Sequence, residues 1–334
     1  MIIGDDIRKI TLLDWLENDL LMPVSRLEPA SSDASFRRYF RITVENRQLI
    51  AMDAPPEKEN IAQFIKVAEM LRPTGIKVPA IYHRNLDDGF LVLEDFGSIS
   101  YLDRLNQDTV TELYGKALAS LFQLQSHSNL MNADLPRYDE ALLERELGIF
   151  EEWFLNRLMD ITISPELWEH VRRLLINSAL EQPVTCVHRD FHSRNLMILI
   201  SDSPGVIDFQ DAVIGPITYD LASLLRDCYI AWPQTQIEHW LQQHHNRLLQ
   251  AGLIDCALPV FTRWFDLMGM QRHLKAIGIF SRLHLRDGKS GYLKDIPRTM
   301  GYVLAQAGAY PELSDFYQFL LHNVDSAYLP EKGI

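Results

Sequence analysis

The segment HRDFHSRN, residues 188–195, gathers ionisable and amide side chains into eight positions. Asp190 follows His188 by two residues, and Asn195 follows Asp190 by five. Another carboxylate, Asp208, stands thirteen residues after Asn195, near the end of the apolar segment GVIDF. A carboxylate can accept or orient the proton of an attacking hydroxyl group, whereas an amide oxygen and a second carboxylate can bind Mg²⁺. This spacing indicates magnesium-dependent phosphoryl transfer to a hydroxyl group.

The order of these residues fits the pattern H-x-D-x-x-x-x-N of a kinase-type catalytic loop. We therefore predict that Asp190 is the catalytic residue and that Asn195 and Asp208 are the metal ligands. His188 is expected to support the loop by bonding to its backbone. His192 has two interpretations, contact with the acceptor or simple packing.

A zinc hydrolase is an alternative from another class of enzyme. His188, Asp190 and His192 alternate in the sequence, so on a strand their side chains would share one face. Together with Asp208 they could bind zinc and activate a water molecule. This alternative gives no role to Asn195 or to the first part of the chain, and no further histidine stands at an obvious ligand spacing.

The elements that must position these residues fall into two groups. Alternating apolar segments predict strands at 36–45, 47–54, 80–85 and 90–95, and amphipathic spacing predicts helices at 7–20 and 58–72. After Gly97, helices are expected at about 108–127, 138–157, 165–181, 219–230, 234–250, 260–284 and 311–322, interrupted by short apolar segments at 185–188, 195–200 and 205–209. We predict an α+β protein with a small β-rich N-terminal lobe, residues 1–96, and a larger helical C-terminal lobe, residues 97–334.

The composition excludes several classes of partner. The chain has 32 Lys and Arg against 45 Asp and Glu, a net charge of −13, which argues against nucleic-acid binding. The N-terminus does not resemble a secretory signal, and no apolar run is long enough for a bilayer, so we expect a cytoplasmic protein without a membrane partner. Its three cysteines form no CxxC pair, which favours a reducing compartment. No oligomeric state follows from the sequence.

Three segments carry a resemblance to a known family: VHRDFHSRNLMI, GVIDFQDA and GPITYDLASLLRD. They resemble the aminoglycoside phosphotransferase and choline kinase-like superfamily. Other segments, among them ASSDASFRRYFR and QRHLKAIGIFSRL, are similar to bacterial kinases that phosphorylate N-acetylmuramate and N-acetylglucosamine at the anomeric hydroxyl group in cell-wall recycling. The resemblance extends from residue 30 to beyond residue 300.

The resemblance implies a protein-kinase-like fold and the cofactors ATP and Mg²⁺. By position, Asp190 would be the catalytic base, with Asn195 and Asp208 as magnesium ligands. Asp220 would brace the catalytic loop through backbone N–H groups, alongside His188. The residues expected to bind the nucleotide are Ser31, Ser32, Asp33, Ser35, Arg37, Glu94 and Phe96.

Two departures from the kinase pattern concern the first lobe. The phosphate-loop segment PASSDASFRRYF contains no glycine, although its small side chains would still let backbone N–H groups approach phosphates. The strand expected to carry an ATP-binding lysine reads LIAMDAPP, with Met52 about where the lysine would stand. The phosphates then need another cation, namely an arginine of the first hairpin, Lys58, Lys66 or a second Mg²⁺. A nucleotide-binding pseudokinase without turnover therefore stays an alternative.

The acceptor is expected to be a small molecule. About ten residues separate Asp208 from the helix predicted at 219, too few for a regulated activation loop. Residues 263–289 carry a local basic excess that could recognise the lactyl carboxylate of N-acetylmuramate, and we predict His192, Arg272 and His273 as substrate-binding residues. Aminoglycosides and small alcohols such as choline or homoserine are the alternative acceptors.

Overall fold

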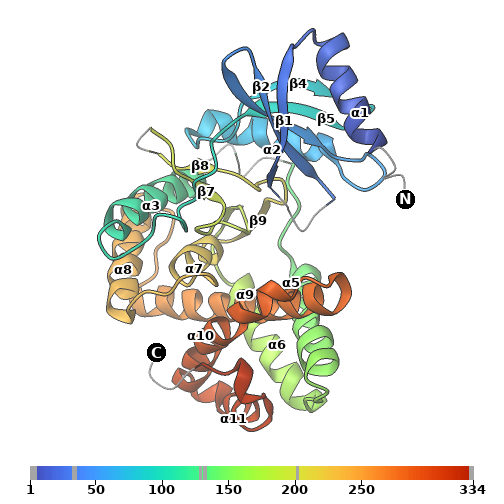
Figure 1. Ribbon diagram of the computed structural model, residues 1–334. Helices are drawn as coiled ribbons and strands as arrows, with labels where there is room; N and C mark the ends of the chain where they lie inside the picture. Colours follow the sequence, from blue (N-terminus) through green and yellow to red (C-terminus); the bar gives the residue numbers. More distant parts are fainter. Residues whose placement is uncertain (1–5, 32–35, 128–129, 131–133, 201–202, 331–334) are drawn as a thin grey trace. The chain divides into compact units, whose positions relative to one another are not determined.

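The computed structural model describes residues 6–31, 36–127, 130, 134–200 and 203–330 (Figure 1). The chain forms two compact units. Unit 1 comprises Met1–Arg104 and Asn195–Gln210, and unit 2 comprises Leu105–Arg194 and Asp211–Ile334. The domain limits expected from the sequence, 1–96 and 97–334, stay a prediction. The compact units differ from them because residues 97–104 and 195–210 group with unit 1.

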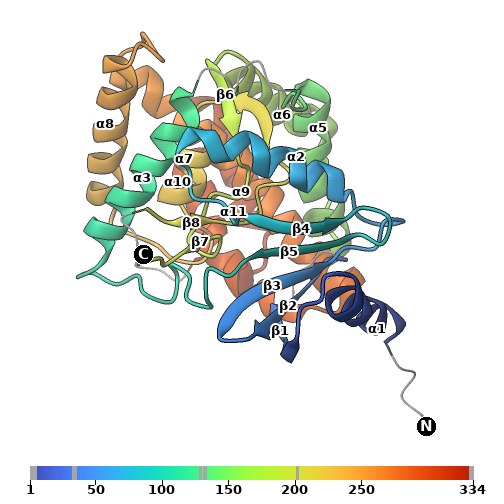
Figure 2. The same ribbon diagram turned by 90° about the horizontal axis from the view of Figure 1, so that it is seen from above.

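Unit 1 is built on an antiparallel sheet with the strand order β1-β2-β3-β5-β4 (Figure 2). Its described elements are α1 (Ile7–Asp14), η1 (Trp15–Asp19), β1 (Val24–Ser31), β2 (Arg38–Val44), β3 (Arg47–Asp53), α2 (Ile61–Leu71), η2 (Arg72–Thr74), β4 (Ile81–Asn85), β5 (Phe90–Glu94), β7 (Leu196–Met197) and β8 (Gly205–Val206). Alternate strand residues such as Phe40, Ile42 and Val92 pack with Leu12 and Trp15 to form a buried core. The period-2 pattern of the strands thus places one sheet face against α1 and η1.

The pair β7–β8 belongs to unit 1 because several contacts hold it there. A β-bridge joins Lys77 to Gly205, and the rings of Phe64 and Phe209 lie 4.9 Å apart. A Cβ atom at Gly205 would come within 2.6 Å of the Phe96 ring. Only glycine leaves room for this close approach, so the turn before Asp208 is packed against Phe96.

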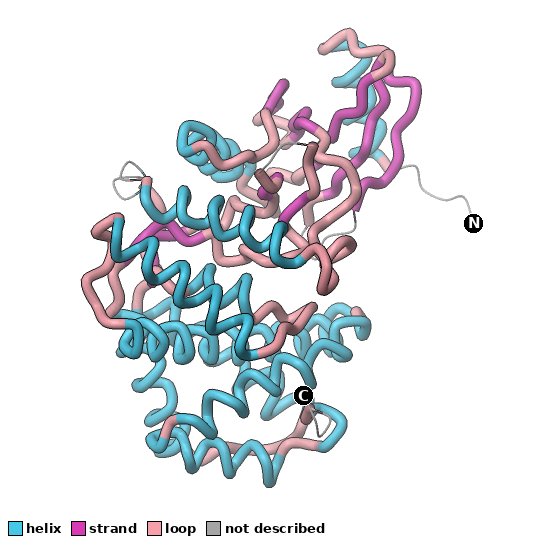
Figure 3. The backbone as a smooth tube through the Cα atoms, turned by 90° about the vertical axis from the view of Figure 1, so that its left-hand side faces the viewer, coloured by secondary structure: helices cyan, strands magenta, loops and turns pink. Residues whose placement is uncertain are grey.

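Unit 2 is mainly helical (Figure 3). Its described elements are α3 (Val110–Ser126), α5 (Glu140–Ile149), the π-helix η3 (Phe150–Leu158), α6 (Pro165–Leu180), β6 (Val184–Val187), β9 (Val213–Pro216), α7 (Tyr219–Leu225), α8 (Gln234–Gln250), α9 (Leu258–Asp287), η4 (Ser290–Asp295), α10 (Ile296–Ala309), η5 (Pro311–Leu313), α11 (Ser314–Asn323) and η6 (Ser326–Tyr328). Within the described residues, no helix is both long enough and apolar enough to span a lipid bilayer.

The 30-residue helix α9 runs through the middle of unit 2 and contacts α5, η3, α6, α7 and α10 (Figure 1). Leu267, Met270, Leu274 and Ile277 are fully buried on it. A Cβ atom at Gly278 would lie only 2.6 Å from the backbone of Ile149, at the junction of α5 and η3. The glycine therefore lets two helical backbones approach closely, and α9 forms the axis of the unit 2 core.

Most predicted helices and strands are present in the structure. The strands β1 and β9 and the helix α10 are present as well, although they were not predicted. β1 is an edge strand with mostly exposed side chains and a proline at position 29, so it lacks the apolar alternation that predicts a strand. α10 has a proline as its second residue and contains Gly301 and Gly308, and these residues are typical of turns and helix ends rather than of a helix interior. β9 pairs with β6 over only four residues. The prediction was also too long at 219–230, because α7 ends at Leu225.

Candidate active site

The predicted catalytic loop begins directly after β6 in unit 2. The backbone N–H groups of His188 and Arg189 donate to the two carboxylate oxygens of Asp220, at 2.6 and 2.9 Å. Asp220 is fully buried in the first turn of α7. Burial raises the pKa of this carboxyl group to about 6, while the charge of His188 and the two N–H bonds act in the opposite direction. Two hydrogen bonds to the Asp220 carboxylate thus hold the loop against α7, and the burial of this carboxylate is energetically unfavourable.

His188 and Arg189 shape the backbone on either side of Asp190. The buried His188 ring accepts a hydrogen bond at Nδ1 from the Asp190 N–H group at 3.2 Å. Arg189 has a φ of +78°, a strained value for a residue with a side chain. Its guanidinium group pairs with the buried carboxylate of Glu146 at 2.5 Å. These contacts fix the backbone conformation at His188 and Arg189, on the N-terminal side of Asp190.

A second buried carboxylate holds the far side of the loop. The backbone N–H and hydroxyl groups of Ser193 both donate to Asp227, at 2.9 and 2.5 Å. Asp227 also accepts a hydrogen bond from the Tyr229 N–H group at 2.8 Å. Sequence reasoning did not single out Asp227, since an aspartate inside the helix predicted at 219–230 carries no spacing signal.

Two cations of α9, Lys275 and Arg272, act electrostatically on Asp190. Burial raises the pKa of Asp190, but the positive charges of Lys275, His192 and Arg272 more than compensate, so the pKa lies below its ordinary value. Lys275 itself pairs with Glu146 at 2.9 Å and donates to the Tyr219 hydroxyl group at 3.2 Å. Asp190 is therefore ionised at neutral pH, as a proton acceptor must be.

The three predicted substrate-binding residues have different surroundings. Arg272 and His192 lie among the charges that act on Asp190. Burial lowers the pKa of His192, with Asp227 and Asp190 acting in the opposite direction, and its ring packs edge-on against Tyr229 at 5.3 Å. His273 is fully buried with Nε2 2.9 Å from the carbonyl oxygen of Arg226, which favours a structural role for this histidine.

Asn195 and Asp208 meet in unit 1 because β7 and β8 pair. Leu196 lies opposite Val206, and the Ile207 N–H group donates to the carbonyl oxygen of Asn195 at 3.1 Å. This pairing brings the Asn195 amide nitrogen to 3.4 Å from a carboxylate oxygen of Asp208. Asp208 has a φ of +64°, in the left-handed region that few residues other than glycine adopt.

The chemistry of this pair fits magnesium. One carboxylate and one amide are hard oxygen ligands, and Mg²⁺ completes its octahedron with waters and phosphate oxygens. The described residues contain no group of three His, Cys, Asp or Glu side chains that could hold a metal ion. The zinc hydrolase alternative needed such a group, and the described residues do not contain one.

A cation stands next to Asp208 even though β3 has no lysine. The guanidinium group of Arg37 lies 3.6 Å from a carboxylate oxygen of Asp208 and 3.9 Å from one of Glu59. Glu59 also accepts a hydrogen bond from the Phe36 N–H group at 3.0 Å, which ties the segment before β2 to the residues before α2. Met52 is fully buried in β3.

The other predicted nucleotide-binding residues are only partly described. Ser32, Asp33 and Ser35 lie outside the described residues, and of Ser31 the structure gives the backbone pairing at the end of β1. The Glu94 N–H group donates to the Ala80 carbonyl oxygen at 2.8 Å, and its carboxylate pairs with Lys77 at 2.8 Å. Phe96 is buried against Gly205.

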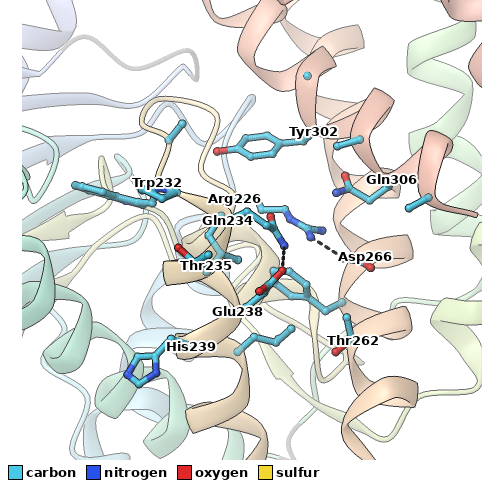
Figure 4. A pocket seen from close by; sticks show the side chains of 18 of the residues that line it. Arg226, Trp232, Gln234, Thr235, Glu238, His239, Thr262, Asp266, Tyr302 and Gln306 are labelled. Carbon is cyan, nitrogen blue, oxygen red and sulfur yellow. Dashed lines mark hydrogen bonds and ion pairs between the residues drawn. The ribbon is translucent and has the colours of Figure 1, made fainter. Parts of the chain in front are cut away.

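Unit 2 also contains a pocket of about 1130 Å³ that none of the predicted site residues lines (Figure 4). The labelled side chains come from α8, α9, α10 and the segment between α7 and α8, and Arg226 reaches across to Asp266 at 2.6 Å. Tyr302 lines the pocket and stacks on His273, with ring centroids 4.9 Å apart.

Comparison with known sequences identifies the family. A sequence model of the phosphotransferase enzyme family (APH) matches residues 26–253. The chain belongs to this family. A relative of this phosphotransferase from Pseudomonas putida, named N-acetylmuramate/N-acetylglucosamine kinase, is 42% identical over 329 residues, covering 94% of this chain and 96% of the relative. A relative of the same name from Neisseria meningitidis is 39% identical and covers 95% of this chain and 96% of its own length.

Solved structures of phosphotransferases share the fold. An ethanolamine kinase of Plasmodium vivax, 13% identical, has a TM-score of 0.60 and covers 92% of this chain and 89% of that one. An aminoglycoside phosphotransferase solved with gentamicin, 14% identical, has a TM-score of 0.59 with coverage of 90% and 97%. These likenesses confirm the predicted protein-kinase-like α+β fold. Membership of this family confirms the prediction that the protein is an ATP-dependent small-molecule kinase. It also implies that ATP is the phosphate donor.

Proposed function

We propose that this phosphotransferase transfers the γ-phosphoryl group of ATP to the anomeric hydroxyl group of N-acetylmuramate or N-acetylglucosamine, as a step in cell-wall recycling. The observation that carries the proposal is the identity of 39–42% with relatives named for these two sugars, over at least 94% of this chain. The cytoplasm is the location that fits the proposed reaction, and it stays a prediction.

The reaction is a displacement at phosphorus. The anomeric oxygen of the sugar forms a bond to the γ-phosphorus, the bond from that phosphorus to the β,γ-bridging oxygen breaks, and ADP leaves with the bond's electrons. The hydroxyl proton passes to Asp190, whose pKa stays low because Lys275 and Arg272 are permanent cations that offset its burial. His188, Asp220, Glu146 and Asp227 act by positioning the loop.

Asn195 and Asp208 would hold Mg²⁺, which neutralises negative charge on the phosphates as the bond breaks. The 3.4 Å separation of their side chains and the hard oxygen atoms they offer support this assignment. The Asn195 amide would turn its oxygen toward the ion, since in the structure its nitrogen faces Asp208.

Arg37 would supply the phosphate-binding charge that a strand lysine supplies in other kinases. Its guanidinium group, positioned by Glu59 and close to Asp208, supports this role, and planar guanidinium groups bind phosphate oxygens in pairs. Ser31, Ser32, Asp33, Ser35, Glu94 and Phe96 stay predicted nucleotide contacts.

An ATP-consumption screen tests the proposal. Purified protein with Mg²⁺ is assayed against N-acetylmuramate, N-acetylglucosamine, aminoglycosides, choline and homoserine, with ³¹P NMR to locate the new phosphate bond. We expect turnover with the two amino sugars, an anomeric phosphate, and a loss of about 10²–10⁴-fold in kcat for Asp190→Asn with ATP binding retained. Turnover only with an aminoglycoside or an amino alcohol would contradict the proposed acceptor, and ATP binding without turnover on any acceptor would indicate a pseudokinase.

A further inference from the structure

Arg272 is a nearly buried cation without a carboxylate partner in the described part of the chain. It lies on α9 with 5% of its surface exposed, and its one hydrogen bond there joins Nη1 to the Cys228 sulfur at 3.6 Å. No carboxylate oxygen of the described residues lies within 4.0 Å of a guanidinium nitrogen of Arg272, the distance that defines an ion pair. A guanidinium group carries five N–H donors, and a buried charge is unfavourable unless it is paired and hydrogen-bonded.

Arg226 is the other arginine among the buried described residues of unit 2, and it has a carboxylate partner, as do the partly buried Lys275 and Arg189. Lys275, one helical turn further along α9, binds Glu146 at 2.9 Å. Arg189 binds the same carboxylate at 2.5 Å, and Arg226 binds Asp266 at 2.6 Å. The fold therefore provides carboxylates for these cations, and among the described residues it provides none for Arg272.

The surroundings of Arg272 place it where the acceptor must bind. It acts electrostatically on Asp190 and His192, so it lies close to the carboxylate that takes the acceptor's proton. Asp227, another nearby negative charge, is already occupied by Ser193 and the Tyr229 N–H group. An acceptor positioned with its hydroxyl group at Asp190 would then lie within the field of an unpaired guanidinium group.

We infer that Arg272 binds a carboxylate of the acceptor, so the preferred substrate is an anionic amino sugar. This inference rests on the proposed function and narrows it. N-acetylmuramate is N-acetylglucosamine with a lactyl ether that ends in a carboxylate, and Arg272 binds that group through two parallel N–H···O bonds. N-acetylglucosamine binds at the same site and leaves Arg272 without its partner.

Paired kinetics on the two sugars test the inference. We expect Arg272→Met to raise the KM for N-acetylmuramate about 10–100-fold, the loss of one charge-assisted contact, and to change the KM for N-acetylglucosamine less than about 3-fold. Arg272→Lys should recover part of the difference, because lysine keeps the charge but loses the paired geometry. Arg263→Met is the matched control, since Arg263 lies on the same helix, half-exposed and paired with Glu312, and neither KM should change.

A second measurement does not depend on the variants folding. The carboxamide of N-acetylmuramate keeps the size of the lactyl group but lacks its charge, and its KM with the unaltered enzyme should rise about as far as Arg272→Met raises that of N-acetylmuramate. Equal losses on both sugars, or no preference for the carboxylate over the carboxamide, would overturn the inference while leaving the proposed kinase intact. If neither sugar is phosphorylated by the unaltered enzyme, the proposed function itself fails.

Discussion

Asp190 is one carboxylate among several in the loop region, and its charge state depends on groups far away in sequence. His188, Asp190, Asn195 and Asp208 could be predicted because a short loop and a hairpin fix their spacing. Lys275, Glu146 and Asp227 come from other elements, and only packing in three dimensions brings them to the loop. Sequence reasoning missed Glu146 and Asp227, and it noted Lys275 only as part of the basic segment 263–289, because no local pattern marks a distant charge.

The dependence of Asp190 on Lys275 gives a pH prediction. Lys275 is the strongest of the positive charges that lower the pKa of Asp190, and burial acts against them. Lys275→Met should therefore raise the pKa of Asp190 and move the acidic limb of the kcat/KM profile to higher pH. Lys294→Met, at an exposed position of η4, should leave the limb in place. An unchanged acidic limb in Lys275→Met would mean that another group sets it.

Arg37 gives a prediction about the nucleotide. We expect Arg37→Met to raise the KM for ATP about 10–100-fold, because a charge-assisted contact to phosphate is lost, and to leave the KM for the sugar nearly unchanged. Arg26→Met, on the exposed edge strand β1, is the control. Should the KM for ATP stay the same, the cation that replaces the strand lysine must be sought at Lys58, Lys66 or a second Mg²⁺.

At the scale of elements, long amphipathic helices and alternating strands could be predicted, whereas β1, β9 and α10 could not. β1 is stabilised by pairing with β2 along its length rather than by burial of its own side chains. α10 tolerates its glycines because Met300, Val303 and Ala307 are buried in the unit 2 core. In both cases tertiary contacts override a weak local preference.

The tie between α7 and the catalytic loop predicts a pH-dependent stability. Burial raises the pKa of Asp220 from 3.8 to about 6, so the folded state binds its proton more tightly than the unfolded state does. Stability from this group is present below pH 3.8 and is lost as the pH rises through 6, by about 3 kcal/mol. In denaturant titrations we would compare the free energy of unfolding of the unaltered protein with that of Asp220→Asn. The difference between the two should fall by about 3 kcal/mol between pH 4 and pH 7. A constant difference would show that Asp220 keeps an ordinary pKa.

Because α9 lies very close to the α5–η3 junction, adding a methyl group at Gly278 is expected to destabilise the protein. Gly278→Ala would press a Cβ atom against the Ile149 backbone, and we expect a loss of about 1–3 kcal/mol in the free energy of unfolding. Gly148→Ala, in α5 with open space around its Cβ, should be neutral or stabilising by about 0.5–1 kcal/mol. Equal effects at the two positions would rule out steric crowding as the cause.

At the scale of the whole molecule, we expect the fold to form without a bound metal. The described chain has a large apolar core in each unit and no cluster of three His, Cys, Asp or Glu side chains that could hold a structural metal. We expect EDTA to abolish turnover and to leave the melting temperature of the nucleotide-free protein unchanged. A fall of several degrees on chelation would reveal a metal that contributes to folding.

Unit 1 is discontinuous, and this has a consequence for how the chain is made. Its last strands, β7 and β8, are synthesised only after residues 105–194 of unit 2 have left the ribosome. Until then Phe64 lacks Phe209, and Phe96 lacks the glycine turn that covers it. Until residues 195–210 are synthesised, the sheet of unit 1 has apolar surface exposed to solvent. Nascent chains with exposed apolar surface bind chaperones. A fragment ending at residue 104 should therefore aggregate, and adding residues 195–210 through a short linker should restore its solubility.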